Sequence, residues 1–559
     1  MSNLDSGFAR VLNLGIIPLI LKFAKAYDLK PFIEARIGKL GPHVKISSSD
    51  LILAIVANLL NSASEPAYAN PEFYSNRPTL SFFGVGSEDI NRHVIGRLLD
   101  KIYEYGVEKF FIELASHIME KMGISPVSIH ADSTSFHYHG ESFKEEGAVL
   151  LTQGYSRDAH PELKQVCSFM VVDGGSELPL AFEPFDGNKS DKQQFPEFIK
   201  SYGLTLQRHY KTIKYVVMDS TGCTPQNIQK INDSDLYLVT CMPNVSKEAK
   251  KCLKVSMDNF DNIYPDDEDL KGFLHPEPIK VGEYNLKALT VRNERMKDKK
   301  AKTINKNAEK QFKDAETRLK KISKQMFGSE KQARSAVESI IKKLKFIAID
   351  TAVIESHEKW GRGRRKADAQ PLIIEYSIKA TVKIDKTAIE NEIDMAVRHT
   401  ILTTDVEREW TAAELFEIYH KQSVVERGWR TMKSPKFFTD SIFLKSPRRI
   451  EAFLWLMTVA LFVLTALTRL VNQAMKAKGL TIPGPSGEFY IEQPTSQRLV
   501  QYIHHMNLSV LIGPGCEPMV LNMQTPFMKI LEALGEDWVF EYSGQRYQAE
   551  KTYGCLNAR

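Results

Sequence analysis

Cysteine is scarce in this sequence, and its spacing carries no metal signature. Only six cysteines occur among 559 residues, and no two of them form a C-x-x-C pair. Because disulfide-stapled domains and structural zinc sites both need closely or regularly spaced cysteines, the sequence predicts neither. The pattern is typical of a protein in a reducing compartment, and we expect the cytoplasm.

A secretory signal and a long apolar run are also lacking. The opening residues, Met1-Ser-Asn-Leu-Asp, contain no basic segment followed by an apolar core, so no secretory signal is predicted. Residues 452–468 carry no charge, but this stretch of 17 residues contains three threonines and is shorter than the roughly 20 residues of a membrane span. A membrane span is the alternative; we predict a buried helix of a large domain and no membrane association.

Positive charge is present but concentrated in one region. The whole chain has a net charge of +5, whereas residues 297–345 alone hold 16 Lys or Arg against six Asp or Glu. A second basic cluster, residues 359–366, includes Arg364 and Arg365. Segregated charge of this kind can neutralise phosphates without reading bases, so we predict that Arg364 and Arg365 bind DNA. A solvated helical hairpin followed by a basic loop is an equal alternative.

Changes in hydrophobic period divide the chain into regions. Apolar residues recur at helical spacing before a break at Gly123 and Pro126, which predicts an independent helical module at the N-terminal side. The predicted regions are 1–122, an N-terminal helical domain; 123–243, the first part of a catalytic core; 244–399, an inserted domain; 400–480, the second part of the core; and 481–559, a C-terminal region with no assigned role.

The core region has the pattern of an α/β fold. Apolar runs rich in β-branched residues predict strands at 127–136, 165–173 and 214–219, and alternating strands and helices indicate a mixed sheet. Beyond the insertion, Thr411 and Glu414 form a capping-box pair that predicts the start of a helix.

Three acidic residues stand where an α/β sheet places a site. Asp132 lies in the first strand, Asp219 ends a later strand, and Glu426 lies on the helix after the insertion. Open α/β sheets bind ligands outside the carboxyl ends of their strands, and hard cations prefer carboxylate oxygens. We therefore predict a catalytic, metal-holding trio, although each residue alone also fits a helix cap or a turn.

The helix that carries Glu426 adds a polar stripe. Tyr419, Gln422, Glu426, Trp429 and Lys433 follow one another at intervals of 3, 4, 3 and 4 residues, which places them on one helical face. This stripe predicts a helix that lines a charged cleft. A solvent-exposed face interrupted by aromatic residues is the alternative.

These segments resemble the DDE transposases of bacterial and archaeal insertion sequences. The resemblance spans residues 127–450 in order and spacing, and more loosely the helical region before them. The matching segments are Asp132-Ser-Thr, Gly154-Tyr-Ser-Arg-Asp, Gly187-Asn188 and Val217-Met-Asp219.

One family signature is matched except at one position. Tyr419-x-x-Gln422-x-x-x-Glu426-x(6)-Lys433 is similar to the signature of the Tyr-Arg-Glu-Lys branch, but Gln422 stands where that branch usually has arginine. The resemblance implies that Tyr419, Gln422 and Lys433 contact the DNA backbone. At Gln422 a neutral donor then replaces a cation.

The resemblance also implies the fold and the cofactor. It implies an RNase H-like mixed sheet with a β-rich plus helical insertion domain, and an N-terminal helical domain that binds DNA ends. In this assignment Asp132 bridges two Mg²⁺ ions, for which Mn²⁺ can substitute, while Asp219 and Glu426 each hold one ion.

We therefore expect a transposase that cleaves DNA and transfers strands. It would act as a homodimer or higher assembly on transposon ends and target DNA, at the nucleoid of a prokaryotic cell. Two alternatives are a metal-dependent nuclease without strand transfer and a catalytically inactive DNA-binding protein derived from a transposase.

Overall fold

The computed structural model describes most of the chain, in two compact units. The described residues are 9–61, 71–140, 144–155, 160–189, 204–244, 246–360, 362, 370–434, 444–513 and 516–550, so Arg364 and Arg365 lie outside them. One unit comprises Met1–Thr240 and Ile418–Arg559, and the other comprises Cys241–Glu417. Each unit is described by itself.

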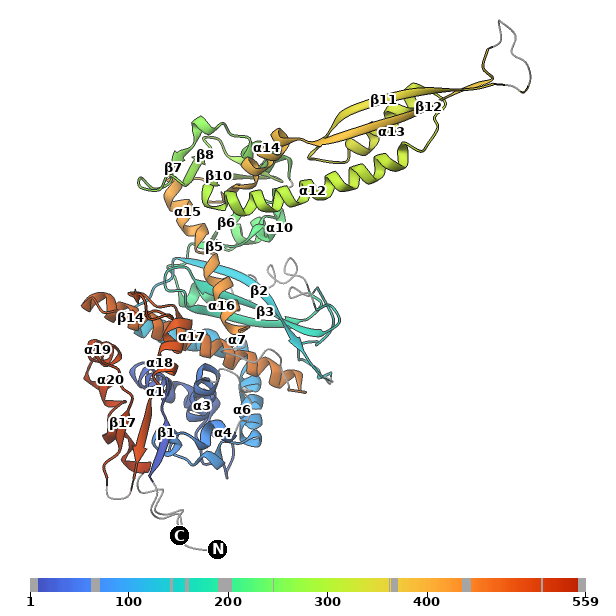
Figure 1. Ribbon diagram of the computed structural model, residues 1–559. Coiled ribbons are helices and arrows are strands. Elements are labelled where there is room, and N and C mark those ends of the chain that lie inside the picture. Colours follow the sequence, from blue (N-terminus) through green and yellow to red (C-terminus); the bar gives the residue numbers. More distant parts are fainter. Residues whose placement is uncertain are drawn as a thin grey trace. The chain divides into compact units, whose positions relative to one another are not determined.

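A mixed sheet forms the centre of the first unit (Figure 1). Its strands lie in the order β4-β3-β2-β5-β6. Antiparallel pairing joins β2, β3 and β4, and parallel pairing joins β2, β5 and β6. The bounds are β2 (Ser128–Tyr138), β3 (Lys164–Asp173), β4 (Pro179–Asp186), β5 (Tyr215–Val217) and β6 (Tyr237–Cys241). This mixed α/β sheet confirms the predicted fold class.

Local sequence explains the ends of these elements. The turn between β3 and β4 is held by Asp173, whose Oδ2 accepts hydrogen bonds from the backbone and hydroxyl of Ser176, both at 2.7 Å. Thr224 caps α10 (Pro225–Asn232), a helix that begins with a proline and leads from β5 to β6. The strands β3 and β4 thus form a hairpin, and β5, α10 and β6 form a strand–helix–strand segment.

One long helix forms the core of the first unit. The helix α17 (Pro447–Lys478) packs against α3 (Ser48–Asn61), α6 (Arg92–Tyr105), α7 (Val107–Lys121) and β4. It is long and apolar enough to cross a membrane, but 94% of its most apolar window is buried inside the protein. This confirms the predicted buried helix.

The N-terminal helices lie in the same compact unit as the sheet. The strand β1 (Arg10–Asn13) pairs antiparallel with β16 (Ser509–Ile512), which also pairs with β17 (Met519–Leu521). Tyr542 donates a hydrogen bond from its hydroxyl to the Gly15 carbonyl oxygen at 3.0 Å. The two ends of the chain thus share one compact unit with the sheet, because the apolar faces of the N-terminal helices pack on α17 and on C-terminal elements.

The other elements of the first unit complete these layers. They are α1 (Ile17–Ala26), α2 (Leu29–Ile37), α4 (Pro71–Ser75), α5 (Thr79–Phe83), α9 (Leu204–His209), α16 (Ser423–Met432), α18 (Ser496–His505), α19 (Thr525–Leu534), α20 (Glu536–Phe540), β14 (Ile482–Pro483) and β15 (Tyr490–Ile491).

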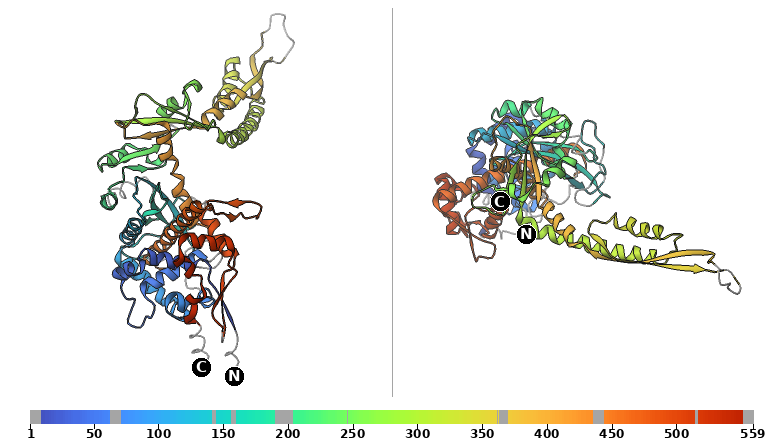
Figure 2. Two further views of the ribbon diagram at one scale, coloured as in Figure 1. Left: turned by 90° about the vertical axis from the view of Figure 1, so that its left-hand side faces the viewer. Right: turned by 90° about the horizontal axis from the view of Figure 1, so that it is seen from above.

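The second unit combines a sheet with a helical and β-hairpin extension (Figure 2). The strands β13, β10, β8 and β7 lie in that order, and β9 also pairs with β10. The bounds are α11 (Lys247–Leu253), β7 (Asp261–Asn262), β8 (Leu270–Leu274), β9 (Ile279–Val281), β10 (Tyr284–Asn293), α12 (Lys297–Ile322), α13 (Glu330–Ile341), β11 (Ile347–Lys359), β12 (Ile373–Ile384), α14 (Lys386–Ala396), β13 (Arg398–Thr403) and α15 (Ala412–His420).

The unit is larger than the predicted insertion, 244–399. The strand β13, which we assigned to the resumed core, pairs with β10 from Arg292↔Arg398 to Lys287↔Thr403 and so completes the sheet of the second unit. The predicted capping box starts α15: Thr411 N donates to Glu414 Oε2 at 3.0 Å, and Glu414 N donates to Thr411 Oγ1 at 3.2 Å.

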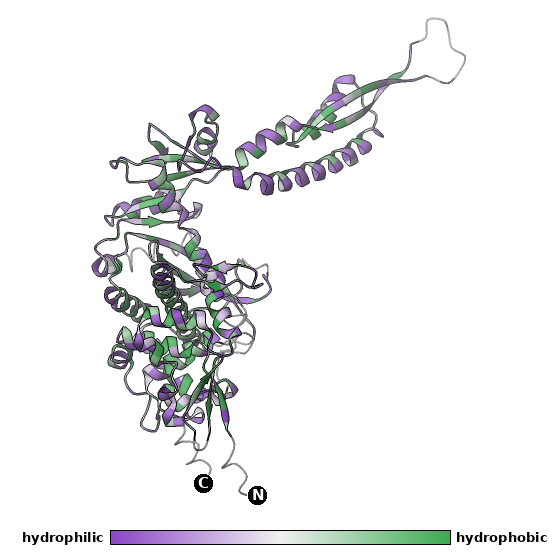
Figure 3. Ribbon diagram, turned by 60° about the vertical axis from the view of Figure 1, so that its left-hand side comes forward, coloured by the Kyte–Doolittle hydropathy of each residue, from purple (hydrophilic) through white to green (hydrophobic). Residues whose placement is uncertain are grey.

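The charged stretch of the second unit forms the predicted helical hairpin. In α12 only Ala308, Ala315 and Leu319 are buried, and they face β12 and α14, so most of the ribbon of α12 is hydrophilic (Figure 3). The hairpin of β11 and β12 packs on α12 and α13 through apolar side chains that include Ile347 and Ile378.

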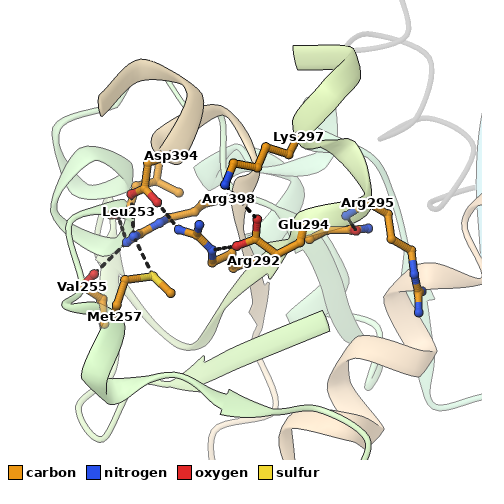
Figure 4. Close-up of polar contacts among 10 residues, drawn as sticks. Leu253, Val255, Met257, Arg292, Glu294, Arg295, Lys297, Asp394 and Arg398 are labelled. Carbon is orange, nitrogen blue, oxygen red and sulfur yellow. Dashed lines mark hydrogen bonds and ion pairs between the residues drawn. The ribbon is translucent and has the colours of Figure 1, made fainter. Parts of the chain in front are cut away.

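A buried charge network ties the sheet of this unit to α14 (Figure 4). Arg398 donates to Asp394 Oδ2 at 2.6 Å and to the Leu253 and Val255 carbonyl oxygens at 2.8 and 2.7 Å. Arg292 also bonds Asp394. Both guanidinium groups thus have an acidic partner inside the fold, as buried charges need.

Candidate active site

The first two acidic residues lie in matched positions on adjacent strands. The parallel pairing of β2 with β5 ends at His130↔Val217, and Asp132 and Asp219 each lie two residues beyond that pair. The chain stays extended at Asp219, with φ −68° and ψ −173°. Because side chains alternate with period two and adjacent strands lie about 4.8 Å apart, both carboxylates occupy the same face of the sheet.

Asp219 is exposed and held in place by its neighbours. Its Oδ1 accepts hydrogen bonds from the backbone N–H of Thr221 at 2.9 Å and from the Thr221 hydroxyl at 2.5 Å. Its carbonyl oxygen accepts from the buried Thr240 hydroxyl at 2.6 Å. The residue is thus a cap, as the alternative interpretation predicted, but both side-chain bonds fall on one oxygen.

The third acidic residue lies on α16, which packs on β2, β3 and α17 (Figure 1). The apolar face of this helix is buried, whereas Glu426 is exposed. Gly428 permits the close approach, because a Cβ there would lie 2.9 Å from Met170 Cε of β3. Within the described residues, no three His, Cys, Asp or Glu side chains lie close enough together to hold a metal ion. Asp132, Asp219 and Glu426 would therefore have to move closer together to bind one.

The predicted polar stripe is not one continuous helical face. The chain turns at Lys421 and Gln422, between α15 and α16, where Gln422 N donates to the Tyr419 carbonyl oxygen at 2.9 Å. Trp429 is only 4% exposed and packs edge-on against Phe136 of β2, with ring centroids 6.1 Å apart. The prediction of a single cleft-lining stripe was therefore wrong, because the chain turns within the stripe and the Trp429 indole packs in the core.

The other predicted DNA-binding residues take different positions. Lys433, which follows α16, is half-buried, and its Nζ lies 6.0 Å from the centre of the Phe136 ring. Tyr419 is half-buried near the end of α15. Gln422 is only 7% exposed.

Gln422 is bound to the strand that carries Asp132. Its Nε2 donates to the Ala131 carbonyl oxygen at 3.1 Å, and its Oε1 lies 3.2 Å from Nδ1 of His130. His130 is fully buried, and burial lowers its pKa to about 4, against the opposing effect of the Gln422 hydrogen bond. The imidazole is thus neutral at neutral pH.

Two residues of this region were missed from the sequence. His130 shares a face of β2 with Asp132, and Thr221 follows Asp219 at the spacing of an Asx-type turn. The period of the strand could have indicated His130. The contact with Gln422 could not be read from the sequence, since 292 positions separate the two residues.

Comparison with known families covers most of the chain. Residues 126–463 match the family described as Transposase DDE domain, and residues 9–116 match a domain of unknown function, DUF4277. The search of curated proteins gave no match. Among solved structures, the chain is similar to a piggyBac transposase synaptic complex with hairpin DNA, with 9% identity, 89% of this chain and 82% of that chain covered, and a TM-score of 0.36.

The family match includes Asp132, Asp219 and Glu426 and extends through the second unit into α17. It covers more than half of the chain, and it includes the strands β2 to β6 and the helix α16, on which these residues lie or which they follow. The chain therefore belongs to the DDE transposases.

Proposed function

We propose that this transposase cuts DNA at the ends of an insertion sequence and joins them to target DNA, with Asp132, Asp219 and Glu426 holding two Mg²⁺ ions. The observation that carries the proposal is the matched register of Asp132 and Asp219, with the helix of Glu426 packed on the same strand. In this proposal Asp132, Asp219 and Glu426 are the residues that would hold the ions.

The donor set fits a hard divalent cation. Three carboxylates offer only oxygen ligands, and such sites keep positions open for water and phosphate. Bound there, two ions would activate the attacking water or 3′-hydroxyl and stabilise the leaving oxygen. Asp219 and Glu426 are exposed, so a DNA strand can reach them.

The remaining residues position the reactants. The Thr221 hydroxyl holds Oδ1 of Asp219, and in this proposal Oδ2 is the oxygen that would bind an ion. Lys433 and Tyr419 contact the DNA backbone next to the cut, and Arg364 and Arg365 add contacts from the insertion. Two DNA ends must be held together for transposition, so the active assembly is a homodimer or larger. It works in the cytoplasm, at the nucleoid.

The test is metal-dependent cleavage of labelled DNA that carries the element's own ends. The wild type is compared with Glu426→Gln and with Glu488→Gln, a matched control at an exposed glutamate of the same unit. We expect the wild type and the control to cut in Mg²⁺ or Mn²⁺, and Glu426→Gln to bind ends without cutting. Equal cutting by Glu426→Gln would remove this residue from the site.

A second assay separates strand transfer from cleavage alone. Pre-cut ends are incubated with a target plasmid, and joined products are measured. Joining supports transposition, whereas cutting without joining would favour a nuclease. Titration of Mn²⁺ by electron paramagnetic resonance on the protein–DNA complex counts the ions, and a stoichiometry of one would overturn the two-ion assignment.

A further inference from the structure

The amide of Gln422 can take only one orientation. The Ala131 carbonyl oxygen only accepts hydrogen bonds, so the Gln422 group that faces it at 3.1 Å must be the NH₂. Oε1 then faces His130 Nδ1 at 3.2 Å, and since Oε1 only accepts, Nδ1 must carry the proton. The three groups therefore form one chain of bonds with complementary donors and acceptors.

The imidazole is held from its other side as well. Nε2 of His130 is buried without a hydrogen-bond partner among the described residues. Gly174, at the turn after β3, lies against it, and a Cβ added to Gly174 would be 2.5 Å from Nε2 and from Ser128 Oγ. The imidazole is thus buried with Gly174 close to Nε2, and its Nδ1 faces Gln422.

The contact between Gln422 and Ala131 joins the two segments that carry the proposed metal ligands Asp132 and Glu426. Ala131 directly precedes Asp132 on β2, and Gln422 precedes Glu426 by four residues, about one helical turn. A bond from Gln422 to the Ala131 carbonyl oxygen thus fixes the first turn of α16 beside the Asp132 backbone. Few other polar contacts could set this distance, because the buried face of α16 is otherwise made of Val424, Val425, Trp429 and Met432.

We propose that Gln422 is a positioning residue, which with His130 holds the helix of Glu426 at the Asp132 strand, and that it is not a phosphate-binding residue. The inference rests on the proposed function of Asp132 and Glu426. It replaces the DNA contact expected at this position. A buried neutral amide with both ends bonded inside the protein does not present a donor to a phosphate, whereas an arginine here would bring a charge into a buried site.

The experiment uses the full chain and two variants that cannot make these bonds. Gln422→Met keeps the length of the side chain, and Gln422→Asn keeps the amide but is too short to reach β2. The matched control is Gln229→Met, at an exposed glutamine of α10. Each protein is measured for end binding at several salt concentrations, for cleavage, for Mn²⁺ affinity by electron paramagnetic resonance, and for amide hydrogen exchange of residues 423–432.

We expect end binding and its salt dependence to be unchanged in both variants. Cleavage and Mn²⁺ affinity should fall by roughly 10- to 100-fold, as is usual when a partner that orients a metal ligand is removed. Hydrogen exchange in α16 should become faster. The control should match the wild type in all four measurements.

Two results would overturn the inference. Weaker end binding at every salt concentration, with an unchanged salt slope and unchanged exchange in α16, would assign Gln422 to a phosphate contact, because a neutral amide releases no counterions. If cleavage and hydrogen exchange were both unchanged, Gln422 would have neither a positioning role nor a phosphate-binding role. If either Gln422→Met or Gln422→Asn fails to fold, the measurements on the other variant test the inference. Failure of the proposed function is recognised separately, since the wild type would then not cut or Glu426→Gln would cut as well as the wild type.

Discussion

Glu451 of α17 accepts a hydrogen bond from the backbone N–H of Val149 at 2.7 Å, although Glu451 is only 6% exposed. Burial raises the pKa of Glu451 to about 8, the Val149 bond opposes this shift, and the nearby carboxylate of Glu108 adds to it. Between the ordinary value of 4.5 and this raised value, the unfolded chain is ionised while the folded chain keeps the proton. The contribution of protonated Glu451 to the free energy of unfolding is therefore fully present below the ordinary pKa and is lost as the pH rises toward 8.

We expect the free energy of unfolding to fall between about pH 5 and pH 8, and Glu451→Gln to remove up to about 4 kcal/mol of that dependence. Chemical denaturation across this range provides the measurement, with Glu492→Gln as a control at an exposed glutamate. Parallel curves for the wild type and Glu451→Gln would show that Glu451 is not protonated in the folded protein.

Removing the Thr221 hydroxyl should impair catalysis more than folding. Thr221→Val deletes the 2.5 Å bond to Asp219 Oδ1 but keeps the backbone bond and the side-chain volume. We expect kcat for end cleavage to fall by roughly tenfold or more, with a higher Mg²⁺ requirement and unchanged end binding. Thr221→Ser, which restores the hydroxyl, should recover most of the rate. Equal loss in both variants would argue against this role.

Substitutions at Gly428 should separate packing from helix propensity. Alanine gains about 1 kcal/mol of helix propensity, and its Cβ would lie 2.9 Å from the flexible end of Met170 and 3.4 Å from Leu461 Cδ2, so the free energy of unfolding should change little. Gly428→Ile should destabilise by about 1–3 kcal/mol because α16 must move away from β3. Thermal unfolding measures the stability, and the isoleucine variant should also cut slowly. A stable and fully active isoleucine variant would contradict this packing.

The hydrophilic face of α12 should contribute DNA affinity without specificity. Lys306 and Lys310 are exposed on the side opposite the buried Ala308 and Ala315. Replacing both lysines by glutamine should reduce the salt slope of end binding by about 0.9 for each phosphate that is no longer neutralised. The charge-matched control replaces Lys476 and Lys478, at the end of α17. An equal change in both double variants would indicate a general effect of charge.

Asp394 should be needed for the stability of the second unit. Asp394→Asn removes the carboxylate that both Arg292 and Arg398 bond, so the buried Arg398 loses this ion pair, whereas Arg292 keeps its ion pair with Glu294. We expect a loss of about 2–3 kcal/mol, measured by hydrogen exchange of β13 in the full chain. Asp350→Asn breaks an exposed pair with Lys383 at 3.5 Å and should cost at most about 1 kcal/mol. If both variants lost a similar amount of stability, the ion pairs of the network in Figure 4 would contribute no more than an exposed ion pair.

Local patterns in the sequence predicted much of the fold and named the candidate residues. Apolar runs rich in β-branched residues indicated β2, β3 and β5, and the spacing of Thr411 and Glu414 indicated the start of α15. These features depend on neighbouring residues, whose side-chain periodicity and hydrogen-bonding groups are visible in the chain itself. The family motifs around Asp132, Asp219 and Glu426 could be recognised because each motif consists of residues close together in the chain.

Only the tertiary structure decided which distant segments meet. The register that aligns Asp132 with Asp219, the pairing of β1 with β16, and the bond from Gln422 to Ala131 all join residues far apart in the chain. Such contacts depend on burial and on complementary donors and acceptors, which no single segment reveals. For that reason the sequence determined that three carboxylates and a helix near Gln422 exist, and folding decided that Gln422 precedes α16 and faces the sheet.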